Sequence, residues 1–139
     1  MLTGSCFCGN VKYNVSGELA DKGICHCLSC RKISGSTYTT NFVIPESNFS
    51  LISGTLKQCT AKHENGMDLT INFCQNCGTT IYKTASLDMF AGVVVLLAGT
   101  VDGGQGVEKA KPNSELWMKY RVDWLPSLEG VTQFNEFPG

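Results

Sequence analysis

The chain has 139 residues, of which 42% are hydrophobic and 17% charged, and its net charge is -1 at pH 7. These values predict one globular domain with a buried hydrophobic core, and they exclude an intrinsically disordered chain. The small net charge, with no run of like charges, argues against a nucleic-acid partner.

The first half of the chain is typical of short strands. Alternating Val11, Tyr13 and Val15 predict a strand within residues 10–17. The segment 36–54 is rich in Thr, Tyr, Phe, Val and Ile, and it predicts a strand into Ile44, a break at Pro45 and a second strand over residues 49–52.

The second half continues this pattern. Residues 55–74 predict a hairpin with Asn65-Gly66 as its two-residue turn, and residues 79–84 and 92–102 predict two further strands. Residues 113–125 favour about one turn of helix that begins near Ser114. Almost no other helical periodicity is present. The sequence therefore predicts a mainly β fold and a single domain over residues 1–139.

The eight cysteines form three groups and one single residue. The groups are Cys6 and Cys8, the triplet Cys25, Cys27 and Cys30, and the pair Cys74 and Cys77, while Cys59 stands alone. The longest hydrophobic run, residues 89–99, is too short to cross a bilayer, and the first ten residues do not have the pattern of a signal peptide. We therefore expect a cytoplasmic protein, with a nuclear location also compatible, and no membrane partner. In such a reducing compartment, clustered cysteines favour metal binding over disulfides.

The spacing predicts two metal sites of different kinds. Two cysteine pairs, C-x-C at the N-terminus and C-x-x-C before Gly78, supply the four thiolates that close a tetrahedral zinc site. The triplet then supplies only three ligands and leaves one position open. Alternatively, Cys59 or His63 completes the triplet, which would give two closed sites. We expect Cys59 to be a small buried residue in a strand and His63 to be exposed beside a turn.

An open three-thiolate site favours a soft ligand such as a cysteine-containing peptide. Three thiolates and one dication leave a net charge of minus one. Arg31 and Lys32, directly after Cys30, are candidates to offset that charge and to contact an anionic substrate, although they are equally compatible with a solvated turn. His26, between two cysteines, is compatible with either a catalytic role or an orientation away from the metal.

Four segments in order, GSCFCGNVKY, CHCLSCRK, FCQNCGTTIY and AGTVD, resemble the glutathione-dependent formaldehyde-activating enzyme family, which includes centromere protein V. The resemblance covers about residues 4–130. It implies an Mss4-like zinc-binding β fold, a structural zinc at Cys6, Cys8, Cys74 and Cys77, and a catalytic zinc at Cys25, Cys27 and Cys30. It also implies carbon–sulfur lyase activity with glutathione as co-substrate. Ile71 stands where the family often has arginine, so the adduct is either the formaldehyde type or another thiol conjugate.

Two functions follow from these observations. A lyase with Arg31 and Lys32 as glutathione contacts predicts a solvent-reaching cleft over the triplet, lined by one of these two residues. A non-catalytic zinc-stabilised protein-interaction module predicts a fourth protein ligand at the triplet and no cleft. For the lyase, His26 and Ser29 are the candidates that sequence offers for proton transfer.

Overall fold

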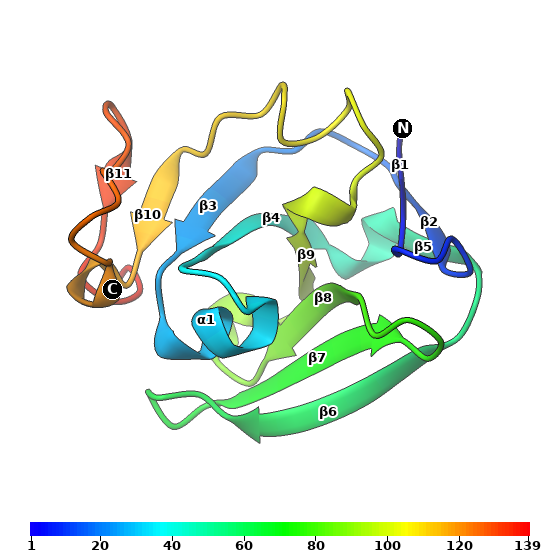
Figure 1. The fold of residues 1–139 in the computed structure, drawn as a ribbon, viewed down its shortest axis with the longest axis horizontal. Helices are drawn as coiled ribbons and strands as arrows, with labels where there is room; N and C mark the ends of the chain where they lie inside the picture. Colours follow the sequence, from blue (N-terminus) through cyan, green and yellow to red (C-terminus); the bar gives the residue numbers. More distant parts are fainter.

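The computed structural model describes residues 1–139 and contains eleven strands and one α-helix (Figure 1). The strands are β1 (Leu2–Ser5), β2 (Lys12–Val15), β3 (Asp21–Cys25), β4 (Thr39–Pro45), β5 (Phe49–Ser53), β6 (Leu56–Lys62), β7 (Asp68–Cys74), β8 (Thr80–Ala85), β9 (Val93–Leu97), β10 (Ser114–Leu116) and β11 (Thr132–Gln133). The helix is α1 (Leu28–Ser34), and the 3-10 turns are η1 (Glu46–Asn48), η2 (Asp88–Phe90), η3 (Ala98–Thr100) and η4 (Met118–Tyr120). The protein is mainly β, as predicted.

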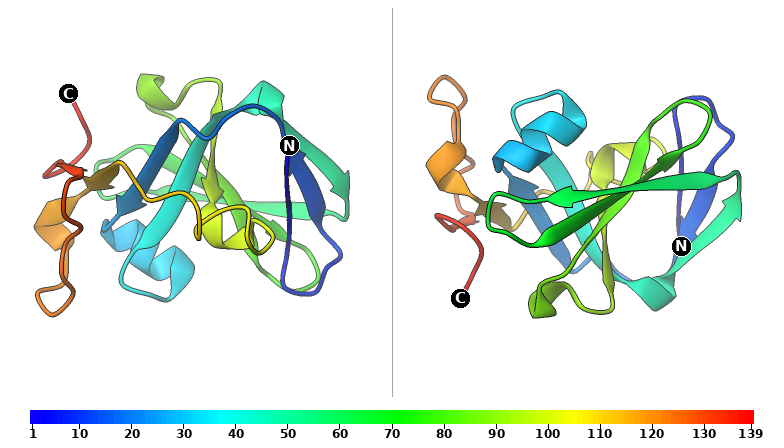
Figure 2. Two further views of the ribbon diagram at one scale, coloured as in Figure 1. Left: turned by 90° about the horizontal axis from the view of Figure 1, so that it is seen from above. Right: turned by 90° about the horizontal axis from the view of Figure 1, so that it is seen from below.

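The strands form two sheets. Strands β1, β2 and β5 make a three-stranded antiparallel sheet, and the other eight follow the order β11-β10-β3-β4-β9-β8-β7-β6. Pairing in the larger sheet is antiparallel, except that β10 runs parallel to both β3 and β11. The larger sheet curves so that α1 lies inside the curve, between β3 and β6 in Figure 1, and Figure 2 shows the same arrangement from above and below.

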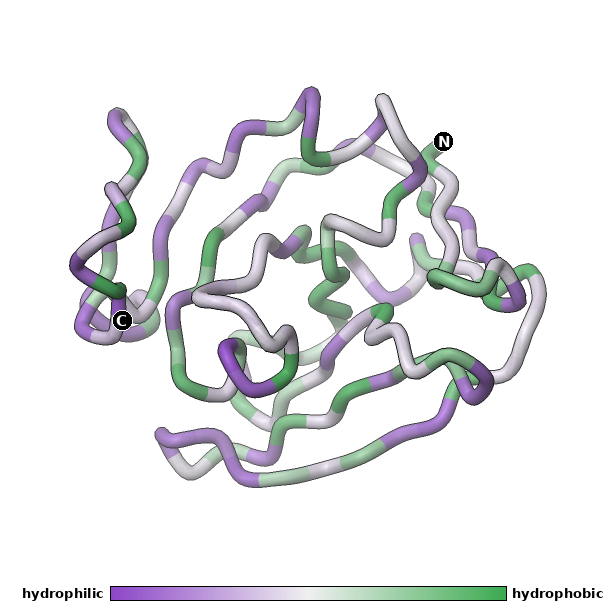
Figure 3. The backbone as a smooth tube through the Cα atoms, viewed as in Figure 1, coloured by the Kyte–Doolittle hydropathy of each residue, from purple (hydrophilic) through white to green (hydrophobic).

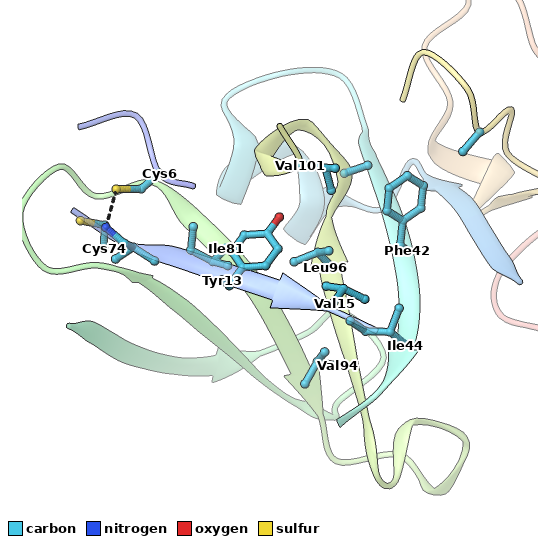
Figure 4. Close-up of a cluster of buried hydrophobic side chains, with 13 residues drawn as sticks. Cys6, Tyr13, Val15, Phe42, Ile44, Cys74, Ile81, Val94, Leu96 and Val101 are labelled. Carbon is cyan, nitrogen blue, oxygen red and sulfur yellow. Dashed lines mark hydrogen bonds between the residues drawn. The ribbon is translucent and has the colours of Figure 1, made fainter. Parts of the chain in front are cut away.

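The main core lies between the two sheets. Val11, Tyr13 and Val15 meet hydrophobic side chains of β4, β8 and β9, and Figure 4 shows this cluster. Strand β9, with the sequence VVVLL, alternates fully buried residues with partly buried ones, and Figure 3 shows its hydrophobic character in the middle of the molecule. Because a strand points successive side chains to opposite faces, Val94 and Leu96 face the core while Val95 faces the other side of the sheet.

The predicted strands all form, but two local predictions were wrong and one element was not predicted. The hairpin of β6 and β7 has a five-residue loop, residues 63–67, instead of a two-residue turn, and Gly66 supplies its positive φ of 93°. Ser114 begins strand β10 instead of a helical turn, and the short helical turn η4 comes four residues later. Helix α1 was not predicted, because seven residues are too few to show helical periodicity.

None of the helices has the length and hydrophobicity of a membrane-spanning segment. The two chain termini lie toward opposite ends of the molecule (Figures 1 and 2).

Candidate functional site

The four paired cysteines come together where the two sheets meet. Cys6 and Cys8 lie in the loop after β1, while Cys74 ends β7 and Cys77 lies in the turn between β7 and β8. All four sulfurs lie within 4.8 Å of one another. The cluster therefore joins the small sheet to the large one, and it brings together the quartet that the spacing predicted.

The geometry of this quartet fits a metal. The Cys6 and Cys8 sulfurs are 3.5 Å apart and those of Cys8 and Cys74 are 3.8 Å apart. These distances are far longer than a disulfide bond, and they are close to the ~3.8 Å edge of a tetrahedron with zinc–sulfur bonds of about 2.3 Å. The backbone N–H groups of Asn76 and Cys77 donate to the Cys74 sulfur at 3.3 and 3.4 Å. Such donors stabilise a thiolate ligand.

The triplet forms a second cluster at the carboxyl end of β3. Cys25 ends this strand, Cys27 is the N-cap of α1, and Cys30 lies in its first turn. The Cys27 sulfur accepts a hydrogen bond from the Cys30 backbone N–H at 3.3 Å, which fixes the start of the helix. All three sulfurs lie within 4.8 Å of one another, and all three residues are at least 95% buried.

A buried lysine contacts this triplet. Lys83, on β8, is 4% exposed, and its ammonium donates to the Cys30 sulfur at 3.3 Å and to the Thr39 hydroxyl at 3.5 Å. Burial alone lowers the pKa of Lys83, but the charge of the Cys30 thiolate, with contributions from Cys25 and Cys27, outweighs it and leaves this pKa raised. The sequence reasoning missed Lys83 because it lies 53 residues from Cys30. The sequence feature that could have identified this residue was a lysine within the hydrophobic strand pattern of β8.

The three thiols differ in how readily they ionise. Hydrogen bonds from Cys25 and Cys27, together with the Lys83 charge, hold the pKa of Cys30 well below its ordinary value despite burial. Cys27 and Cys30 raise the pKa of Cys25, and burial adds to this effect. A hydrogen bond from Cys25 lowers the pKa of Cys27, but Cys30 and burial raise it to about 12. The Cys30 thiolate therefore forms readily. Ionisation of all three cysteines needs an added cation, and a bound metal ion would supply it.

The triplet opens onto a cleft of about 420 Å³. Cys25, Cys27, Cys30 and Lys83 line it, and none of the four paired cysteines does. The cleft lies on the face of the large sheet that carries Val43 and Val95, and residues of the C-terminal segment line it too.

Neither predicted basic residue lines this cleft, so that prediction was wrong. Arg31 donates from Nη2 to the backbone carbonyl of Tyr120 at 2.5 Å, because the turn of α1 directs it toward η4. Lys32 is exposed and borders a separate hollow between α1 and β6. Lys83 supplies the cation in the cleft. Contact of Arg31 and Lys32 with glutathione stays a prediction, and it would have to be made outside the cleft.

The expected exposures of His63 and Cys59 were both wrong. His63 is 4% exposed, because its ring packs against the rings of Trp117 and Phe137 at 5.0 and 5.8 Å between centroids. Cys59 is exposed, because β6 is the edge strand of the sheet and no other layer covers it. Cys59 does not belong to the cluster of the triplet, so it does not supply a fourth ligand in this structure.

His63 lies next to the triplet and lines the cleft. One of its ring nitrogens, a Glu64 carboxylate oxygen and the Cys27 sulfur lie within 4.8 Å of one another. Its Nδ1 accepts a hydrogen bond from the Asn65 backbone N–H at 3.1 Å, so the proton of the neutral ring is on Nε2, which lies 2.8 Å from Glu64 Oε1. Binding of a metal ion by Nε2 would require loss of this proton and of the contact with Glu64. In this arrangement the Nε2 of His63 is engaged with Glu64 and does not complete the triplet.

Glu64 also holds the beginning of α1. Its carboxylate accepts hydrogen bonds from the Leu28 backbone N–H at 2.5 Å and from the Ser29 hydroxyl at 2.6 Å. Sequence reasoning did not find this residue, because it lies about 36 residues from the helix that it caps.

The two proton-transfer candidates from sequence do not line the cleft. His26 is 1% exposed, and its Nε2 lies 3.0 Å from the Glu115 carboxylate, on the side away from the cleft. Ser29 is committed to Glu64 and borders the outer hollow. Both residues therefore have structural roles here.

Comparison with known proteins places the chain in a family. The model of the family described as glutathione-dependent formaldehyde-activating enzyme matches residues 1–120. The chain belongs to this family. Membership in the glutathione-dependent formaldehyde-activating family supports a function related to glutathione, and the two cysteine clusters are candidates to bind metal.

The fold of this family member is also found in a solved structure. A crystal structure of a Rhodobacter sphaeroides protein has a TM-score of 0.60 and 18% identity, and the match covers 79% of this chain and 96% of that chain. At this identity the similarity concerns the fold alone. No curated protein matches the chain.

Proposed function

We infer that the protein is a zinc-dependent carbon–sulfur lyase that acts on glutathione adducts. One observation carries this proposal: the three-cysteine cluster lines a cleft, whereas the four-cysteine cluster does not. The four sulfurs of the quartet, within 4.8 Å of one another, equal the number of ligands of a structural zinc. The three sulfurs of the triplet, beside a cleft, equal the number of protein ligands of a catalytic zinc with one open position. Two zinc ions per chain are thus part of the proposal.

The proposed reaction forms or breaks one bond between sulfur and carbon. In the forward direction the glutathione sulfur adds to the carbon of an aldehyde, and the thiol proton ends on the oxygen, which becomes a hydroxyl. When bound at the triplet, zinc supplies stabilisation of a thiolate at its open position. The cysteines hold that ion, and the cleft admits the aldehyde.

Lys83 and His63 have distinct parts in this proposal. The Lys83 ammonium, 3.3 Å from the Cys30 sulfur, offsets the negative charge of three thiolates in a buried site. His63 is the ionisable ring that faces the cleft beside Cys27. Because Nε2 carries the proton and lies 2.8 Å from Glu64 Oε1, Glu64 holds the ring in place, and donation of this proton to an oxygen in the cleft would require the ring to leave that contact.

The experiment is an assay of S-hydroxymethylglutathione formation by the zinc-loaded protein. We expect the Cys27→Ser variant to lose at least about tenfold in rate, because it removes one of only three ligands. Cys59→Ser is the matched control, because Cys59 is an exposed thiol outside both clusters, and its rate should equal that of the wild type. Equal rates for the two variants would contradict the proposed role of the triplet.

The non-catalytic interaction module is the alternative. It requires a fourth protein ligand at the triplet and no cleft, whereas Cys59 lies elsewhere, Nε2 of His63 is engaged with Glu64, and the triplet lines a cleft. These observations favour the lyase. Full zinc loading with no turnover of any glutathione adduct would favour the module.

A further inference from the structure

The outer wall of the cleft comes from the C-terminal segment. The family match ends at residue 120, yet Thr132, Phe134, Phe137 and Pro138 line the cleft. Strand β11 pairs with β10, and the Met118 backbone N–H donates to the carbonyl of Phe134 at 3.1 Å. These bonds attach the segment to the edge of the large sheet. The segment is therefore a fixed wall that the family pattern does not specify.

Phe137 connects this wall to the rest of the cleft. Its ring lies 5.3 Å from that of Phe90 and 5.4 Å from that of Trp117, both in edge-to-face geometry, and it stacks on His63 at 5.8 Å. The ring therefore lies between Trp117, just before η4, and Phe90 in η2, and it contacts the histidine beside the triplet.

Most of the other residues that line the cleft are hydrophobic. Beyond Phe90 and Phe137, the aliphatic and thioether side chains that line it are Val43, Met67, Leu69, Ala85, Met89, Val95 and Leu116, while Asp21, Asn41, Thr84, Asn113, Ser114 and Thr132 add polar groups. Lys83 is the only lysine among the lining residues, arginine is absent from them, and the Lys83 ammonium is committed to Cys30. A carboxylate in the cleft would consequently have no free lysine or arginine to pair with, and burial of an unpaired charge is costly.

This chemistry does not match glutathione itself, a peptide with two carboxylates and one ammonium. Nor does it match formaldehyde, because a one-carbon group would leave most of the 420 Å³ unfilled. An apolar group attached to the sulfur would fill the space and bury against the hydrophobic walls.

We propose that the substrates are thiol adducts of aldehydes that carry a sizeable apolar chain. This proposal rests on the lyase function above. The apolar chain lies against Phe137 and Met89, the sulfur lies at the triplet, and the glutathione peptide remains at the mouth of the cleft. Phe137 is then a specificity-determining residue.

Binding of two unreactive thioethers tests the proposal directly. S-hexylglutathione and S-methylglutathione share the peptide and differ by five methylene groups, and their affinities for the zinc-loaded protein are measured by calorimetry. We expect S-hexylglutathione to bind at least about tenfold more tightly, because its chain buries in the cleft. In turnover, we expect the glutathione adduct of hexanal to exceed that of formaldehyde in kcat/KM by at least about tenfold.

Variants of the cleft test where the apolar chain of the substrate binds. Phe137→Ala and Met89→Ser should each reduce the preference for S-hexylglutathione at least about threefold, while circular dichroism confirms the fold. Val107→Ser is the matched control, because Val107 is 46% exposed, close to the 49% of Met89, but lies outside the cleft. Its preference should equal that of the wild type.

The outcomes separate this proposal from the lyase function. Equal affinity for the two thioethers, together with faster turnover of the formaldehyde adduct, would overturn the apolar specificity and leave the lyase intact. Tighter binding of S-hexylglutathione with no turnover of either adduct would overturn the lyase and leave the apolar cleft. A preference that Phe137→Ala and Met89→Ser do not change would overturn the placement of the chain.

Discussion

Replacement of Lys83 by methionine should weaken metal binding at the triplet and leave the quartet unaffected. Methionine is an unbranched side chain of similar length without the charge. At 3.3 Å from the Cys30 sulfur, the ammonium contributes a gross attraction of about 5 kcal/mol at an effective dielectric constant of about 20. The desolvation of Lys83, which the variant no longer pays, offsets part of this energy. We expect a net loss of about 1.5–3 kcal/mol, or roughly ten- to a hundredfold in zinc affinity.

The assay is zinc release to a colorimetric chelator from protein loaded with two zinc ions. In Lys83→Met one zinc should be released at least about tenfold faster, and the other should match the wild type. The control is Lys32→Met, because Lys32 is exposed and lies outside the cleft, and it should change neither phase.

The metal-free protein gives a second readout. Because the Lys83 charge helps to lower the pKa of Cys30, the variant should raise that pKa and slow alkylation of Cys30 at neutral pH, as mass spectrometry would measure. Unchanged zinc release together with unchanged alkylation in Lys83→Met would refute the charge-offset reasoning. So would an equal effect of Lys32→Met.

Three further predictions concern stability. Burial raises the pKa of Glu64, but hydrogen bonds from α1 outweigh this effect and leave the pKa lowered from 4.5. The ionised Glu64 carboxylate therefore stabilises the fold above about pH 4.5, and this stabilisation is lost as the pH falls through the lowered pKa. Glu64→Gln should therefore reduce the free energy of unfolding by about 1 kcal/mol at pH 7 and by less at pH 3.5 in urea titrations; an equal difference at both pH values would contradict this. Gly4→Ala would place a Cβ 2.1 Å from the Tyr13 ring and should lower the free energy of unfolding by about 2 kcal/mol or more, whereas Gly103→Ala, with open space around it, should be close to neutral; equal urea midpoints would contradict the packing. Cys74→Ser should unfold the protein, by circular dichroism, because it opens the quartet that joins the two sheets, and a native spectrum would contradict that role.

The strands could be predicted because their signals are local. Tyr13 and Val15 alternate along β2 with Val11 directly before it, and Pro45 ends β4 before β5 begins. The first turn of α1 could not be predicted in this way. Its N-cap is a cysteine, and the carboxylate that accepts its first backbone N–H belongs to Glu64, in a distant hairpin loop. Standard capping signals rely on Ser, Thr, Asp or Asn at the N-cap.

The residues of the site also differ in whether a local sequence signal identifies them. The cysteine spacing predicted both clusters, because ligands two or three residues apart must share a turn. Sequence could not identify Lys83, His63 and Phe137 as cleft residues, because β8, the loop of residues 63–67 and the C-terminal segment meet only in the folded sheet. Arg31 and Lys32 were chosen for their proximity to Cys30 in sequence, but the turn of α1 directs both away from the cleft.

The central claim is that the quartet is closed and the triplet has one open position for a thiol. Cobalt substitution tests it most directly, because absorption bands of cobalt report the number of sulfur ligands. We predict that glutathione increases the sulfur-to-cobalt charge-transfer absorption of the wild type and that Cys27→Ser abolishes this increase while retaining the quartet spectrum. A spectrum that glutathione does not change, with both sites loaded, would contradict the claim.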